Sequence, residues 1–264
     1  MRLLPSVLML ALVVRPLVAQ LPAAEHVALG DSAHAALKPD EALRHYQAAL
    51  QQDSTNYEAL WKAARSVADV AKQIQGGADS LKKRRDRLYS IGRGYAEAAL
   101  RADSTRAEGH FALAMVLGRL SRTRGGKERV RFARIIYDEA SRAIAIDSTH
   151  DGAHHVLGAW HAEVKRLSGF TRFFAKTLFG AGFMNKATWA DAQRSLERAV
   201  ALKPQNVYHH LELAEVYVDV GKYTAAREQL AMIDTLPVGD VLDPQYKKEA
   251  ADLLAEIRDK KDKA

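Results

Sequence analysis

Three histidines in the middle of the sequence are the side chains best suited to bind a metal ion. His150, His154 and His161 fall on one face of an expected helix, with Asp147 and Asp151 close in sequence. Imidazole and carboxylate groups are zinc ligands, so this face could form a zinc site. A catalytic zinc needs three converging ligands, however, and the His-Glu-x-x-His pattern is absent. We keep metal binding by this face as an alternative and predict neither a metal nor a cofactor.

An aromatic segment at residues 168–187 could bind apolar groups next to positive charge. Its candidate binding residues are Phe170, Arg172, Phe173, Phe174, Lys176, Phe179 and Phe183. The segment could fold across a concave face and place its aromatic side chains in the core. It could equally line an apolar pocket, or lie on a membrane with its cations at the level of the headgroups. The sequence leaves these alternatives open.

A basic patch precedes the aromatic segment. Its members are Arg124, Lys127, Arg129, Arg131 and Arg134. Such a patch could attract anionic lipid headgroups or an acidic protein. Long cationic side chains also commonly cover a solvated helix face, which is the simpler interpretation.

The sequence contains no recognisable catalytic motif. It has no cysteine and no Gly-x-Ser-x-Gly element for a nucleophile. The glycine pairs Gly92/Gly94 and Gly180/Gly182 lack the third glycine and the lysine of phosphate-binding loops. We therefore predict a protein that is not an enzyme and has no catalytic residues.

The composition favours a helical globular chain. Of its 264 residues, 48% are hydrophobic and 27% charged, and the 7 prolines and 16 glycines are few enough to exclude a disordered or collagen-like chain. Alanine, leucine, arginine and glutamate are good helix formers, whereas aromatic residues make up only 7%. We expect an all-α fold with almost no strand.

Residues 1–20 have the pattern of a secretory signal peptide. Arg2 precedes an apolar run from 3 to 14, and small residues follow around Ala19. We predict an exported bacterial protein of the periplasm or cell envelope, with retention of the segment as an anchor as the alternative. Such a protein meets little nucleic acid, so we expect a protein partner or anionic lipid, with peripheral membrane association possible. The oligomeric state stays open.

The tripeptide Asp-Ser-Thr marks internal repeats. It occurs at 53–55, 103–105 and 147–149, each time after an apolar stretch with helical spacing, and Lys-Pro-Gln takes the same place at 203–205. Each repeat is therefore expected to be a pair of helices joined to the next by one of these junctions.

Two junctions also have the Thr-x-x-Glu spacing of a helix capping box, in Thr55 with Glu58 and Thr105 with Glu108. In such a box the hydroxyl and the carboxylate satisfy amides that the first helical turn leaves unpaired. We predict that these pairs begin the helices that follow.

The spacing of small and large residues in the last repeat predicts a tetratricopeptide-like helix pair. Its members are Leu213, Ala214, Tyr217, Gly221, Tyr223, Ala226 and Leu230. Junction alanines 49, 99, 143 and 199 lie 50, 44 and 56 residues apart, against about 34 in a standard repeat. We predict a right-handed helical solenoid over 21–264, with lengthened helices, the insertion at 168–187 and a capping helix at 244–260.

A more specific resemblance depends on short motifs spread along the chain. They are Trp61-Lys-Ala-Ala64-Arg65, Leu157-Gly158-Ala-Trp160, the element from Arg172 to Gly180, and Leu236-Pro237. Together they resemble the regulator of microtubule dynamics family over residues 40–258. The resemblance implies an all-helical, tetratricopeptide-like domain. Eukaryotic members are described as microtubule-associated or as tethers at organelle contacts, where the helical domain can hold a phospholipid.

These observations predict a non-enzymatic binding or scaffold protein of the cell envelope. The concave face of the repeat domain would bind a protein segment or a lipid. The alternatives are a carrier of phospholipid or acyl chains, a tether at a membrane, and the metal-binding protein considered first. An exported bacterial chain meets no microtubule, so we do not extend that role to it.

Overall fold

The computed structural model describes residues 21–169, 171, 177 and 180–263. The predicted signal peptide therefore lies outside the described residues, as do the candidate binding residues Phe170, Arg172, Phe173, Phe174, Lys176 and Phe179. Within the described residues the regular structure is helical, and no strand occurs. None of the helices found there is long and apolar enough to cross a membrane.

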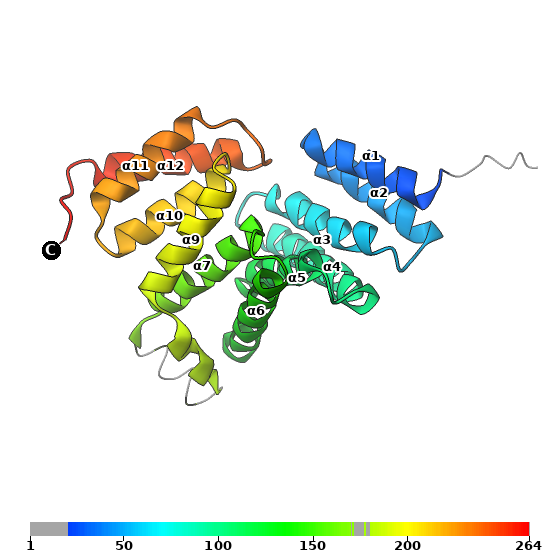
Figure 1. The fold of residues 1–264 in the computed structure, drawn as a ribbon, viewed down its shortest axis with the longest axis horizontal. Helices are drawn as coiled ribbons and strands as arrows, with labels where there is room; N and C mark the ends of the chain where they lie inside the picture. Colours follow the sequence, from blue (N-terminus) through cyan, green and yellow to red (C-terminus); the bar gives the residue numbers. More distant parts are fainter. Residues whose placement is uncertain (1–20, 170, 172–176, 178–179, 264) are drawn as a thin grey trace, which may run out of the picture.

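The described helices form successive pairs arranged in a curved row (Figure 1). The pairs are α1 (Ala23–Ala35) with α2 (Pro39–Gln52), α3 (Tyr57–Lys72) with α4 (Asp79–Ala102), α5 (Ala107–Ser121) with α6 (Gly126–Ile146), α7 (Asp151–Arg166) with α9 (Trp189–Leu202), and α10 (Val207–Asp219) with α11 (Tyr223–Thr235). Helix α12 (Asp243–Ile257) follows α11, and a short 3₁₀ helix, η1 (Ala181–Lys186), lies between α7 and α9. The predicted tetratricopeptide-like solenoid is confirmed.

The extra length of the repeats lies mainly in two helices. Helices α4 and α6 have 24 and 21 residues, whereas α1, α10 and α11 have 13 each. The additional turns of α4 and α6 include the clusters of basic residues near their N-termini. The prediction of lengthened helices is therefore confirmed.

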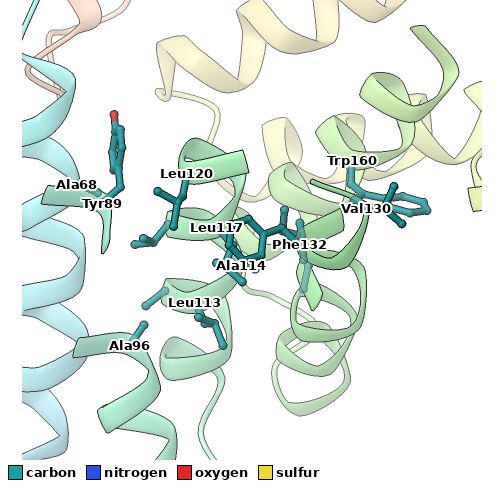
Figure 2. Packing of buried hydrophobic residues seen from close by; sticks show 14 of the residues in the cluster. Ala68, Tyr89, Ala96, Leu113, Ala114, Leu117, Leu120, Val130, Phe132 and Trp160 are labelled. Atoms are coloured by element: carbon teal, nitrogen blue, oxygen red, sulfur yellow. The ribbon is translucent and has the colours of Figure 1, made fainter. Parts of the chain in front are cut away.

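The central core is built from small and large side chains on neighbouring helices. Figure 2 shows Leu113, Leu117 and Leu120 of α5 between α4 and α6, with Phe132 of α6 beside them. Buried alanines of α3 and α4 let those helices approach closely, and the leucines fill the space that they leave. The same alternation of small and large residues gave the repeat signal in the sequence.

The Asp-Ser-Thr junctions are turns held by the aspartate, and the predicted capping boxes are wrong. Asp53 Oδ1 accepts hydrogen bonds from the backbone amide and the hydroxyl of Thr55, at 3.0 and 2.8 Å, and the other two junctions repeat this arrangement. The threonine hydroxyl is thus engaged outside the helix. Helix α3 is capped one residue later, because Asn56 Oδ1 accepts from the Ala59 amide at 3.0 Å.

Gly158 marks a close contact between α7 and α9. A Cβ atom at this position would lie 2.7 Å from Leu196 Cγ and 3.1 Å from the Ala192 carbonyl oxygen. Leu196 is fully buried, so its side chain has no free space to move into. By contrast, a Cβ at Gly94 in the middle of α4 would meet no atom within 4 Å.

We predict opposite effects on stability for alanine at these two glycines. Gly158→Ala should lower the free energy of unfolding by about 1 to 2 kcal/mol, because overpacking costs more than the gain in helix propensity returns. Gly94→Ala, the matched control, should raise it by about 0.5 to 1 kcal/mol. Urea unfolding of both variants measures the difference, and equal effects at the two sites would contradict the close packing of α7 on α9.

Candidate functional site

The concave side of the solenoid is closed by a contact between residues far apart in sequence. Lys72 at the end of α3 forms ion pairs with Asp69, at 2.8 Å, and with Asp240 in the α11–α12 loop, at 3.2 Å. Close by, the Gln75 side-chain amide donates to Gln245 at 3.2 Å. These bonds join the third helix to the last one and leave a cavity of about 380 Å³ between them.

Charge is divided between the walls of this cavity. The cations Lys72, Arg85, Arg119 and Arg122 come from the segment between α3 and α6, whereas the acids Glu163, Glu212, Glu215 and Glu249 come from α7, α10 and α12. Arg166 of α7 is the cation on the acidic side. Aliphatic side chains contribute little to the lining. The cavity is therefore polar, and most of its cations and acids come from different helices.

Three tyrosines surround Arg119, one from α4 and two from α10 and α12. Tyr208 and Tyr246 stack with ring centroids 4.5 Å apart, and the Arg119 guanidinium lies 5.4 Å from the centroid of Tyr208. The third, Tyr89, also lines the cavity and is buried. A guanidinium over an aromatic face is attracted by the ring, so the tyrosines hold Arg119 in place without neutralising it.

The acidic wall holds a carboxyl group that can change its protonation near neutral pH. Burial raises the pKa of Glu215 to about 7, and the negative charge of Glu212 adds to the rise against the opposing effect of Arg166. Arg166 pairs with Glu215 at 3.3 Å and with Asp219 at 2.8 Å. The net charge of this wall therefore depends on pH.

Two buried histidines, His155 and His209, connect Asp151 to the ring of Tyr208. Asp151 contacts His209 Nε2 at 2.9 Å, His209 Nδ1 lies 3.0 Å from His155 Nδ1, and the His155 ring packs on Tyr208 with centroids 4.7 Å apart. Burial holds the pKa of His155 well below its ordinary value, so this ring stays neutral. Sequence reasoning missed His155 and His209, whose pairing joins α7 to α10.

The histidines singled out as possible zinc ligands have separate structural roles. His150 caps α7 by accepting from the Ala153 amide at 3.2 Å, and His154 bonds the Ser148 carbonyl at 3.0 Å. His161 Nδ1 accepts from the Thr188 amide at 3.3 Å. Among the residues that the structure describes, no group of three His, Cys, Asp or Glu side chains could hold a metal ion. The zinc hypothesis therefore has no supporting geometry.

The described part of the aromatic segment does not line the cavity. Phe183 in η1 lies 6.2 Å from the Trp160 ring between centroids, and the Arg134 guanidinium lies 4.4 Å from the Phe183 centroid. Phe183 thus packs against the central core cluster. The other candidate residues of the segment are among those that the structure leaves undescribed.

The predicted basic patch also lies apart from the cavity. Arg124 is neutralised by ion pairs to Asp86 and Glu128, and Arg131 contacts Glu128 at 3.4 Å. Lys127 and Arg129 are exposed at the start of α6. None of the patch residues is found in the cavity lining.

A comparison with protein families identifies the family of this chain. A family model described as Regulator of microtubule dynamics protein 1-3 matches residues 27–258. This range includes all the helices that form the cavity. The chain belongs to the regulator of microtubule dynamics family.

Curated members of this family are distant relatives in sequence. Regulator of microtubule dynamics protein 3 of Rattus norvegicus is 27% identical over 196 residues, which cover 74% of this chain and 40% of the relative. The Xenopus laevis protein of the same name is 28% identical over 181 residues, covering 68% and 38%. The chain thus spans about 40% of the length of these relatives.

Two solved structures share the fold of this chain. A thermophilic TPR protein of Thermus thermophilus aligns with a TM-score of 0.61 at 19% identity, covering 88% of this chain and 99% of its own. Pseudomonas aeruginosa pilF aligns with a TM-score of 0.52 at 14% identity, covering 90% and 86%. At these identities the likeness is one of fold.

The raised pKa of Glu215 predicts how stability depends on pH. Between its ordinary value of 4.5 and about 7, the folded state keeps a proton that the unfolded state releases. The free energy of unfolding should therefore fall as pH rises through this window. The Glu215 side chain is 39% exposed and screened by water, so the fall should be about 1 kcal/mol.

Urea unfolding at a series of pH values from 4 to about 8 would measure this fall. Glu215→Gln should remove it, because glutamine takes up no proton. Glu228→Gln, which removes an exposed carboxylate on α11, should leave the slope of the wild-type protein unchanged. The interpretation is wrong if Glu215→Gln and the wild-type protein have the same slope.

Proposed function

We propose that this protein is a non-enzymatic scaffold that holds a segment of a partner protein in its concave cavity. The observation that supports this most directly is the cavity of about 380 Å³, which Arg119, the stacked Tyr208 and Tyr246, and several glutamates line together. A peptide segment offers charged side chains and backbone groups that such a lining can bond. The apolar residues 3–14 after Arg2 favour a location in the cell envelope.

The chemistry of the lining favours a protein segment over an acyl chain. Pockets that hold acyl chains need mostly apolar walls, because burying polar groups without partners costs free energy. Here the aliphatic lining is confined to Ile74, Leu211 and Leu242. An acyl chain inside the cavity would remove water from this polar lining, including the Arg119 guanidinium, and would offer no hydrogen bond in return.

Anionic lipid remains the second candidate, at the surface and outside the cavity. Lys127 and Arg129 are exposed, and no carboxylate of the described residues forms an ion pair with either of them. Exposed cations of this kind attract anionic headgroups. This contact would tether the scaffold to a membrane without using the cavity.

Selection from a library of random linear peptides displayed on phage tests the main proposal. We expect selected peptides to bind the wild-type protein and to slow hydrogen exchange in α5, α10 and α12, which line the cavity. Gln245→Trp should weaken their binding about tenfold or more, since each 1.4 kcal/mol lost is a factor of ten. Gln245 is exposed at the cavity, so tryptophan there would obstruct the entrance.

Gln205→Trp is the matched control, because Gln205 is exposed in the turn before α10 and does not line the cavity. It should leave peptide binding unchanged. Failure to select any peptide would overturn the proposal, as would peptides that bind Gln245→Trp as well as the wild-type protein. Sedimentation with phosphatidylglycerol vesicles tests the second candidate, which predicts loss of binding in the Lys127→Glu, Arg129→Glu double variant.

A further inference from the structure

Two hydrogen-bond donors, the Arg119 guanidinium and the Tyr246 hydroxyl, meet in the cavity. Among the described residues, the buried Tyr246 hydroxyl has no acceptor for its proton, in a residue that is only 6% exposed. Arg119 lies close enough for its charge to lower the pKa of this hydroxyl, against the larger effect of burial. No carboxylate among the described residues lies within ion-pairing distance of the Arg119 guanidinium, although the structure pairs many of its other arginines.

Two of the other cavity cations from the segment between α3 and α6 are already engaged, and the third, Arg122, is exposed to solvent. Lys72 is paired with Asp69 and Asp240. Arg85 donates to the carbonyl oxygens of Ile74 and Gly76, at 2.8 and 2.9 Å. Arg119 therefore differs from them, because a half-buried charge and a buried hydroxyl meet there with no acceptor. Buried polar groups without partners are rare in folded proteins, and they point to a binding role.

A carboxylate has the chemistry that completes this arrangement. Its two oxygens can accept from a guanidinium fork and from a hydroxyl at the same time, and such charge-assisted bonds are strong. A phosphate would bring up to two negative charges towards a wall that already holds Glu212 and Glu215. The nearby glutamates therefore favour a singly charged group over a phosphate at Arg119.

We propose that Arg119 and Tyr246 form a subsite for a carboxylate of the bound protein segment. The carboxylate is either the C-terminal group of the segment or the side chain of an acidic residue. A basic residue beside it would find glutamates of α7, α10 and α12 in the same cavity lining. This proposal rests on the proposed function, and it adds which chemical group anchors the segment and where.

Short peptides test the subsite directly. The probes are N-acetyl-Ala-Leu-Ala with a free carboxylate, its C-terminal amide, N-acetyl-Ala-Glu-Ala amide and N-acetyl-Ala-Gln-Ala amide. The carboxylate peptides should shift the Arg119 Nε–H signal in the NMR spectrum, and the two uncharged peptides should not. The stronger of the two carboxylate peptides identifies the source of the group. If no probe shifts this signal, the subsite proposal is wrong.

Variants distinguish a binding role from a structural one. Arg119→Gln should weaken carboxylate binding about tenfold or more, as expected for the loss of a charged hydrogen bond. The backbone amide signals of α5 and α12 report this affinity. Arg142→Gln removes an exposed arginine of α6 with the same change in net charge and should have no effect.

Tyr246→Phe best distinguishes a binding role of the hydroxyl from a structural one. Because the hydroxyl has no partner in the free protein, its removal should leave the melting temperature unchanged or raise it. The same change should lower carboxylate affinity several-fold. A lower melting temperature with unchanged affinity would overturn the proposal. If phage-selected peptides still bind the cavity when these tests fail, only the subsite is wrong, whereas failure of the phage selection itself removes the proposed function.

Discussion

The ion pairs of Lys72 are the contact on which the cavity depends. The lysine side chain is 12% exposed, and its two partners lie on α3 and on the loop before α12, 168 residues further along the chain. Although burial acts to lower the pKa of Lys72, the charges of Asp69 and Asp240 outweigh it and raise the pKa, so the amine stays charged. Buried ion pairs add little net stability because desolvation offsets attraction, but they are specific in geometry. Here they define how far the curved row of helices closes.

Small residues at the helix contacts set how closely the two helices of a repeat pack. Gly30 sits against Tyr46, and Gly158 against Leu196, at distances that no side chain could occupy. In a solenoid each repeat touches only its neighbours, so the rotation at each contact accumulates along the row. The Lys72–Asp240 ion pair adds a contact between repeats that are not neighbours, because it joins the end of α3 to the α11–α12 loop.

The fold was largely predictable from sequence because its signals are local. The Asp-Ser-Thr turns and the alternation of small and large residues lie within single repeats, where helical spacing makes them visible. The capping boxes failed because each helix begins one residue later, after Asn56 or Arg106, so the threonine is not at the N-cap, which spacing alone does not show. The cavity was not predictable, since its lining extends from Lys72 to Glu249 and becomes contiguous only when the row closes. The sequence favoured the aromatic segment instead, because its candidate residues lie close together in the chain. Phe183, the described one of these candidates, packs against the core.

Hydrogen bonding distinguishes the residues that support the cavity from the residue that we expect to bind a ligand. The supporting residues are fully bonded: His209 joins Asp151 to His155, and Tyr208 donates to Glu212 at 2.7 Å. Tyr246, whose ring stacks on Tyr208, is equally enclosed, but its hydroxyl has no partner among the described residues. Selection for stability alone would favour phenylalanine there, because an unpaired buried hydroxyl costs about 1 to 3 kcal/mol. A rigid, satisfied frame around one unsatisfied donor is the arrangement expected when the missing acceptor belongs to a ligand.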